Sequence, residues 1–175
     1  MVTHAALAAQ RAHSFANGNP FVLAGDFNFK PDSSIYALLT TGHLEHDHPH
    51  QPPVIEGDSW RADVPVPLVS AYVSATGSEP DFTNLATTKI DSEPFVSTLD
   101  YIFLSDKGTS SRWRALNVRP LPLREEVLRT CKSYPTADEP SDHVAIWVDL
   151  ELVDASSSAN DLCPCLESAK RIALS

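Results

Sequence analysis

Short apolar runs separated by turn residues recur along the chain, and their spacing predicts several β-strands. Residues 21–24 form an apolar run between turn residues, which is typical of a strand buried on both faces. Residues 98–104 combine β-forming side chains with alternation, which is a stronger strand signal. Similar but weaker patterns predict further strands at 68–74, 113–121 and 144–153.

Helical signals lie in the first quarter of the chain. Residues 3–17 are rich in alanine and are followed by Gly18, which predicts a helix that ends there. A shorter helix is predicted at about 34–40, and prolines in and around 43–63 predict an irregular surface excursion. Because helices come early and strands dominate the second half, we expect an α/β layered fold with a mixed or mostly antiparallel sheet.

The 175 residues are enough for one domain with a hydrophobic core. We expect this domain at 1–153, followed by a tail at 154–175 that is disordered or forms only a loose helix near 166–174. No apolar run approaches the ~20 residues that span a bilayer. Three cysteines do not make a disulfide framework, which favours a cytoplasmic protein, with the nucleus as an alternative.

The formal net charge of −10 argues against a basic surface that binds nucleic acid. It does not exclude an enzyme that meets phosphate through a divalent cation, which supplies the missing positive charge.

One pair of cysteines and one cluster of histidines could in principle bind zinc. Cys163 and Cys165 lie in the tail and make a poor site by themselves. The segment 42–50 contains four histidines, but no thiol accompanies them and their spacing is not that of a helical pair. A solvated loop is therefore the favoured interpretation.

Polar groups suited to phosphate chemistry occur at three strand ends. Asp26 and Asn28 follow an apolar strand. In an extended strand, residues two apart point to the same face, so we expect these two side chains to share one. Asp100 interrupts an apolar strand, and Asp142-His143 precedes the last one. Taken singly, each also fits a turn, a backbone-bonded strand end or a structural histidine.

In chain order, these segments resemble three motifs of one superfamily. Gly-Asp-Phe-Asn at 25–28, Leu-Asp-Tyr-Ile-Phe at 99–103 and Ser-Asp-His at 141–143 resemble motifs of the endonuclease/exonuclease/phosphatase superfamily. Ser-Ala-Tyr, Glu-Pro and Thr-Asn between residues 70 and 84 resemble a series found in its deadenylase branch, which nocturnin and the 2',5'-phosphodiesterases share in part. The resemblance extends over roughly residues 5–152.

The resemblance implies a role for each motif residue. Asp26 would orient or deprotonate the attacking water, and Asn28 would hold a phosphoryl oxygen. His143 would stabilise charge on the phosphate in the transition state, and Asp100 would fix the tautomer of its ring. Asp142 would hold the metal together with Asn28.

The implied cofactor is Mg²⁺ or Mn²⁺, because the ligands are oxygen atoms. Asn84 and Phe95 would bind substrate, with the ring of Phe95 stacked on a base. A core position for Phe95 is an equally open alternative. The expected partner is an RNA or nucleotide substrate.

We therefore expect a metal-dependent phosphodiester hydrolase, specifically a 3'-5' exoribonuclease that trims poly(A). The alternatives are a nucleotide phosphatase, a 2',5'-phosphodiesterase and a catalytically inactive truncated fragment. The implied fold is part of a two-sheet α/β sandwich, as in deoxyribonuclease I, with the N-terminal half missing. That half carries a glutamate metal ligand and an early histidine, for which His4 is a poor substitute, so we expect the 175-residue chain alone not to sustain full activity.

Overall fold

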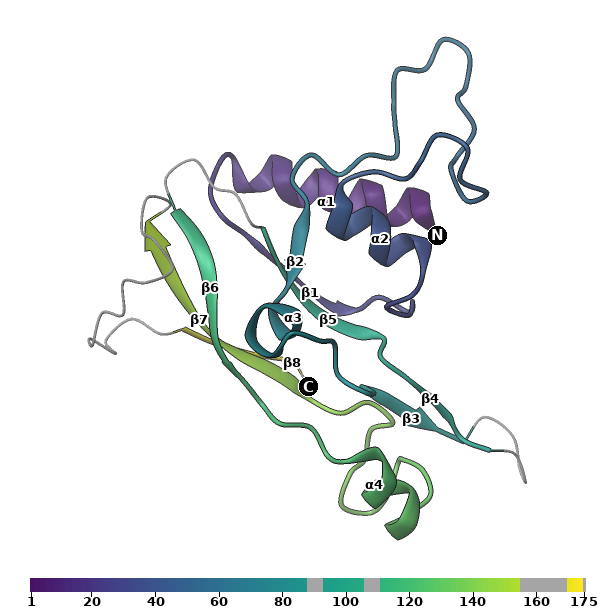
Figure 1. Cartoon of the computed structure of the whole chain (residues 1–175), viewed down its shortest axis with the longest axis vertical. Coiled ribbons are helices and arrows are strands. Elements are labelled where there is room, and N and C mark those ends of the chain that lie inside the picture. The colour runs from purple at the N-terminus through teal and green to yellow at the C-terminus, as the bar shows by residue number, and fades with distance from the viewer. Residues whose placement is uncertain (88–92, 106–110, 155–169, 175) are drawn as a thin grey trace.

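The computed structural model describes residues 1–87, 93–105, 111–154 and 170–174 (Figure 1). Its helices are α1 (Val2–Ala16), α2 (Ser34–Thr41), α3 (Ala71–Thr76) and α4 (Arg124–Thr130). Its strands are β1 (Val22–Asp26), β2 (Leu68–Ser70), β3 (Asn84–Ala86), β4 (Phe95–Ser97), β5 (Asp100–Ser105), β6 (Ser111–Val118), β7 (Ile146–Asp154) and β8 (Lys170–Leu174). The strands pair antiparallel, so the expected mixed α/β fold class is confirmed.

The central strand of the first sheet is β5, with β1 and β2 on either side of it. Its alternate side chains enter two different cores. Tyr101 and Phe103 pack with α1 and α2, whereas Ile102 and Leu104 pack on the opposite face. The edge strand β1 also contributes to both cores, but its residues are only half-buried or exposed.

The second sheet has the order β6-β7-β8 and covers the face of β5 that points away from α1. Ile146, Val148 and Leu150 of β7 are almost fully buried in the same cluster as Ile102. Helices α1 and α2 therefore form one layer, the β1-β5-β2 sheet the next, and the β6-β7-β8 sheet the third (Figure 1).

The β3-β4 hairpin and α4 lie at the end of the molecule away from α1 (Figure 1). Phe82, Leu85, Val127 and Tyr134 join them in a third apolar cluster. An isolated bridge between Asn84 and His143 ties the hairpin to the segment before β7. The hairpin thus fixes the position of the Ser-Asp-His motif.

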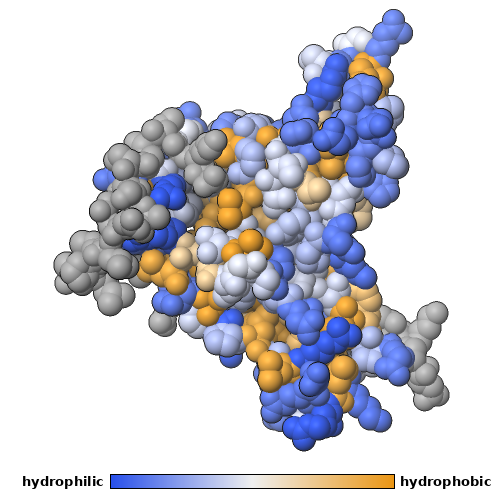
Figure 2. All heavy atoms as spheres, viewed as in Figure 1, coloured by the Kyte–Doolittle hydropathy of each residue, from blue (hydrophilic) through white to orange (hydrophobic). Residues whose placement is uncertain are grey.

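The predicted surface excursion at 43–63 contains no helix or strand and projects beside α1 and α2 (Figure 1). It is mostly hydrophilic (Figure 2), although Val54 and Ile55 are largely exposed on it. The amide of Val64 donates to the carbonyl of Gly42 over 2.7 Å and closes its base. Gly42 has a φ of 93°, a left-handed conformation that glycine adopts without strain.

Several predicted elements differ from the structure. The strand expected at 68–74 ends at Ser70, because the Ser70 side chain accepts from the amide of Val73 and caps α3. The loose helix expected near 166–174 is wrong for residues 170–174, which pair with β7 as a strand. Residues 155–169 lie outside the described residues. No apolar pattern in the sequence predicts the short elements β3, β4 and α4.

No helix within the described residues is long and apolar enough to cross a membrane.

Ile102 is buried between the two sheets, so its truncation should lower the free energy of unfolding. Ile102→Ala should destabilise the protein by roughly 2–5 kcal/mol, because Ile102 is fully buried and its loss leaves a cavity. The matched control is Ile55→Ala, at an isoleucine that is 65% exposed on the excursion. Urea unfolding of both variants measures the difference; equal stabilities would contradict the assigned core.

Candidate functional site

A cavity of about 300 Å³ lies where β1 ends and β5 begins. Its lining includes Asp26, Asp100, Ser141 and His143. Asp26 and Asp100 stand directly opposite each other in the antiparallel register of β1 and β5. The structure therefore brings together three predicted site residues from three different segments, namely Asp26, Asp100 and His143.

A hydrogen bond joins the two central groups of the site. His143 Nδ1 lies 2.8 Å from Oδ2 of Asp100, and both side chains are largely shielded from solvent. With Nδ1 held by the carboxylate, Nε2 is the ring nitrogen available to a ligand in the cavity. The resemblance implies this contact between the two side chains, and the orienting role of Asp100 stays a prediction.

Thr83 is a site residue that the sequence analysis did not identify. Its hydroxyl donates to Oδ2 of Asp100 over 2.6 Å and accepts from the amides of Leu99 and Asp100 at 2.9 and 3.0 Å. Thr83 is completely buried, so these bonds form away from water. The only sequence signal was its place in the Thr-Asn pair, since a neutral hydroxyl carries no obvious chemistry.

Asp142 and Asn84 form a second pair beside the cavity. The Asn84 amide Nδ2 lies 3.2 Å from both the carbonyl oxygen and Oδ2 of Asp142. Asn84 is buried, and the Leu85 amide also donates to the Asp142 carbonyl. Neither residue is among those that line the cavity. The contacts of Asn84 with Asp142 orient this carboxylate.

Asn28 is not among the residues that line the cavity of Asp100 and His143. Strand β1 ends at Asp26, and Asn28 has a φ of 54° in the following loop. The expectation that Asp26 and Asn28 share one face of an extended strand is therefore wrong. The two residues are linked instead through the Asn28 amide, which donates to Asp26 Oδ1 over 2.9 Å. The Asn28 residue lines a neighbouring cavity of about 890 Å³ beside the start of α2.

Phe95 begins β4 and is 37% exposed, so its ring is not a core side chain. The ammonium of Lys30 lies 5.6 Å from the ring centroid. Phe95 does not line the cavity of Asp100 and His143, but it lies on the strand that leads into β5. An exposed ring at this place is suited to stacking on a base.

The charges of the site act together on His143. Burial lowers the pKa of His143, but the hydrogen bond to Asp100 and the charges of Asp100, Asp26 and Asp142 outweigh burial and raise it above the usual value. The three carboxylates therefore favour the imidazolium form, which suits a group that stabilises negative charge on a phosphate.

The oxygen donors around the site match the preference of Mg²⁺ or Mn²⁺ in kind. Within the described ranges, however, no three side chains of His, Cys, Asp or Glu come together to hold an ion. Mg²⁺ commonly keeps several waters and takes one or two carboxylates. Asp142 thus fits as one ligand of such an ion.

The histidine segment retains its interpretation as a loop. The rings of His48 and His50 are 5.5 Å apart. His50 Nδ1 is 2.8 Å from the Ser34 hydroxyl, and His48 Nδ1 accepts from the His50 amide over 3.1 Å. These nitrogens serve local structure, and the zinc interpretation gains no support.

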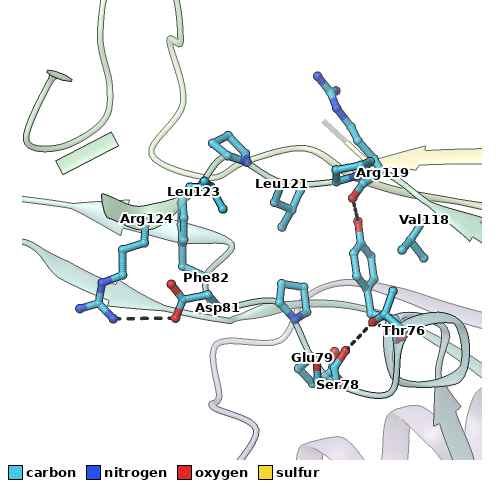
Figure 3. A pocket seen from close by; sticks show the side chains of 14 residues that line it. Thr76, Ser78, Glu79, Asp81, Phe82, Val118, Arg119, Leu121, Leu123 and Arg124 are labelled. Atoms are coloured by element: carbon cyan, nitrogen blue, oxygen red, sulfur yellow. Dashed lines mark hydrogen bonds and ion pairs between the residues drawn. The ribbon is translucent and has the colours of Figure 1, made fainter. Parts of the chain in front are cut away.

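A second cavity of about 310 Å³ lies between residues 76–82 and 118–124 (Figure 3). Two polar contacts join residues that line it: the Tyr72 hydroxyl donates to the Arg119 carbonyl over 3.3 Å, and Arg124 pairs with Asp81 at 3.9 Å. None of the predicted site residues lines it. Phe82, which lines this cavity, directly precedes Thr83 in the chain.

Comparison with known proteins adds independent information. The profile of the Endonuclease/Exonuclease/phosphatase family matches residues 3–143. The 2',5'-phosphodiesterase 12 of Mus musculus is 34% identical over 134 residues, which are 77% of this chain and 20% of that protein. The CCR4-Not complex 3'-5'-exoribonuclease subunit Ccr4 of Coccidioides immitis (strain RS) is 30% identical over 144 residues, which are 80% of this chain and 17% of that protein. This chain therefore spans about a fifth of the length of the curated relatives it matches.

The Asp100–His143 pair predicts a defined pH dependence. In Asp100→Asn the pKa of His143 should fall, because burial still disfavours the imidazolium while the main opposing partner is gone. In wild type the raised pKa means that protonated His143 stabilises the fold. That contribution is complete below the unfolded-state pKa of about 6.5 and is lost as pH rises through the folded-state pKa.

The measurement is an NMR titration of the His143 ring in both proteins. Asp58→Asn, on the excursion, is the control and should leave the His143 titration in place; Asp58 there accepts a hydrogen bond from the Trp60 amide. An unchanged His143 titration in Asp100→Asn would show that the bond does not control the ring.

Proposed function

This chain belongs to the endonuclease/exonuclease/phosphatase family, and we propose that it carries part of the active site of a metal-dependent phosphodiester hydrolase that trims the 3' end of RNA, most specifically poly(A). The observation that carries the proposal is the hydrogen-bonded pair of His143 and Asp100, which opens on the same cavity as Asp26. An imidazolium and a carboxylate that face one cavity supply the charge stabilisation and the base that hydrolysis of a phosphodiester requires.

Each side chain has a role in this proposal. Asp26 orients or deprotonates the attacking water at the cavity. His143 donates through Nε2 to a phosphate oxygen and stabilises the charge that develops there. Asp100 is a positioning residue, because it holds Nδ1 and thereby fixes the tautomer and the orientation of the ring.

A bound divalent ion would act as Lewis acid and template for the phosphate. Asp142 is the proposed ligand, and the hydrogen bonds from Asn84 would set the direction of its carboxylate. Asn28 is the proposed partner of a phosphoryl oxygen or of the ion, and its link to Asp26 couples its loop to the base.

Phe95 and Asn84 are proposed to bind the substrate, Phe95 by stacking on a base. The proposal of poly(A) trimming is supported by the relative named as a 3'-5'-exoribonuclease. A 2',5'-phosphodiesterase is the second candidate, because the mouse relative at 34% identity is named for that linkage. A nucleotide phosphatase and an inactive fragment remain the outcomes that the assays below would reveal.

We also propose that residues 1–153 are one part of a two-sheet α/β sandwich like that of deoxyribonuclease I. The layering of the β1-β5-β2 sheet on the β6-β7-β8 sheet supports this proposal.

The proposed function is tested by measuring hydrolysis of 3',5'-linked and 2',5'-linked oligoadenylate by the intact protein. We expect hydrolysis of the 3',5'-linked substrate from its 3' end, and preference for the other linkage would select the second candidate. Asp100→Asn should lower kcat on the order of 10²-fold while the fold is retained, because the His143 ring loses its orientation. Asp58→Asn is the control. Wild-type turnover in a folded Asp100→Asn variant would refute the proposed role.

Removal of divalent ions tests the metal. With excess chelator, turnover by the intact protein should be abolished, and Mg²⁺ or Mn²⁺ should restore it, because the oxygen ligands of the site favour these ions. Undiminished hydrolysis in chelator would rule out the metal mechanism.

A further inference from the structure

Lys30 lies beside Phe95 and has no role in the proposed reaction. Its exposed side chain places the ammonium 5.6 Å from the centroid of the Phe95 ring, which is itself 37% exposed. The backbone on its N-terminal side is fixed, because the Tyr101 hydroxyl donates to the Phe29 carbonyl over 2.9 Å and the Phe29 ring stacks on Tyr101. An exposed cation therefore extends from a fixed point of the backbone.

This pair lies beyond the reaction site along two neighbouring segments. Asp26 is opposite Asp100 in the β1-β5 register, and the Phe27 amide donates to the Leu99 carbonyl over 2.9 Å. Lys30 lies four residues after Asp26, and Phe95 five residues before Asp100. The two segments thus leave the site together, and the ring and the ammonium meet further along the same path.

The charge around the site makes this cation significant. The chain has a net charge of −10, and Lys30 lies in sequence between Asp26 and Asp32. A polyanionic substrate meets repulsion from such a surface unless a local cation neutralises its phosphates. Lys30 supplies this charge beside the ring where a base would stack.

We propose that Lys30 is a specificity-determining residue that binds the phosphate adjoining the nucleotide stacked on Phe95, and so favours oligonucleotides over diesters that lack this phosphate. The inference rests on the proposed phosphodiesterase function. A cation–π contact at an exposed site is weak. The ammonium can therefore exchange part of it for a charge-assisted bond to a phosphate oxygen when substrate arrives.

The test compares Lys30→Gln and Lys30→Arg in the intact protein. Arg11→Gln is the matched control, because Arg11 lies 5.3 Å from the Phe15 centroid in the same kind of contact on α1. Steady-state kinetics are measured with an oligoadenylate and with bis(p-nitrophenyl) phosphate, a diester that carries no second phosphate. Binding of a labelled oligoadenylate is measured by fluorescence anisotropy over a series of salt concentrations.

For Lys30→Gln we expect KM for the oligoadenylate to rise about tenfold with kcat nearly unchanged. The kcat/KM for the small diester should stay the same. The slope of log K against log salt should become shallower by about 0.7, the value for one contact with a single strand. Lys30→Arg should retain most of the affinity, and Arg11→Gln should behave like wild type.

Equal loss on both substrates, or an equal loss in Arg11→Gln, would overturn the proposal for Lys30 while leaving the hydrolase intact. A wild-type protein that hydrolyses neither substrate would refute the proposed function instead. In that case the anisotropy measurement still decides the role of Lys30, and unchanged binding in Lys30→Gln overturns it.

Discussion

The buried hydroxyl of Thr83 is the contact on which the geometry of the site depends. It accepts from the amides of Leu99 and Asp100 and donates to the Asp100 carboxylate, whose Oδ2 also meets His143. The Thr83 backbone contributes as well, since its amide donates to the Ser97 carbonyl and its carbonyl accepts from the Val144 amide. Thr83 therefore joins β4, the start of β5 and the segment before β7. Its buried hydroxyl holds the Asp100 carboxylate, which in turn holds the His143 ring.

The rest of the fold makes this contact rigid. Strand β5 is buried on both faces, with Tyr101 against the helices and Ile102 against the second sheet, so Asp100 starts from a fixed backbone. The hairpin β3-β4 and the cluster around Phe82 then bring Asn84 and Asp142 to the same side. The apolar layers determine where the strands end, and the polar groups of the site lie at those ends.

Much of this could be predicted from sequence, because its strongest signals are local. The apolar runs that became β1, β5 and β7 were visible as patterns, and so were the charged groups at their ends, Asp26, Asp100 and His143. The role of Thr83 could not be predicted, because a hydroxyl acquires it only when residues 16 and 17 positions away fold against it. The left-handed backbone of Asn28 and the direct change from β2 to α3 after Ser70 are likewise set by local hydrogen bonds that periodicity does not reveal. Lys30 shows the same limit, since its contact with Phe95 depends on how the loop after β1 passes strand β4.

The bond between Gly42 and Val64 closes the base of the excursion at 43–63, and Leu44 and Ala62 anchor its two ends in the first core cluster. Its exposed middle, residues 53–59, can therefore change in length without altering the distance that the scaffold must bridge. Each doubling of a flexible loop costs only about 0.6 kcal/mol in closure entropy. The excursion is therefore where relatives of this chain can diverge in size, acquire an insertion or accept an introduced peptide while the strands beneath it keep their register.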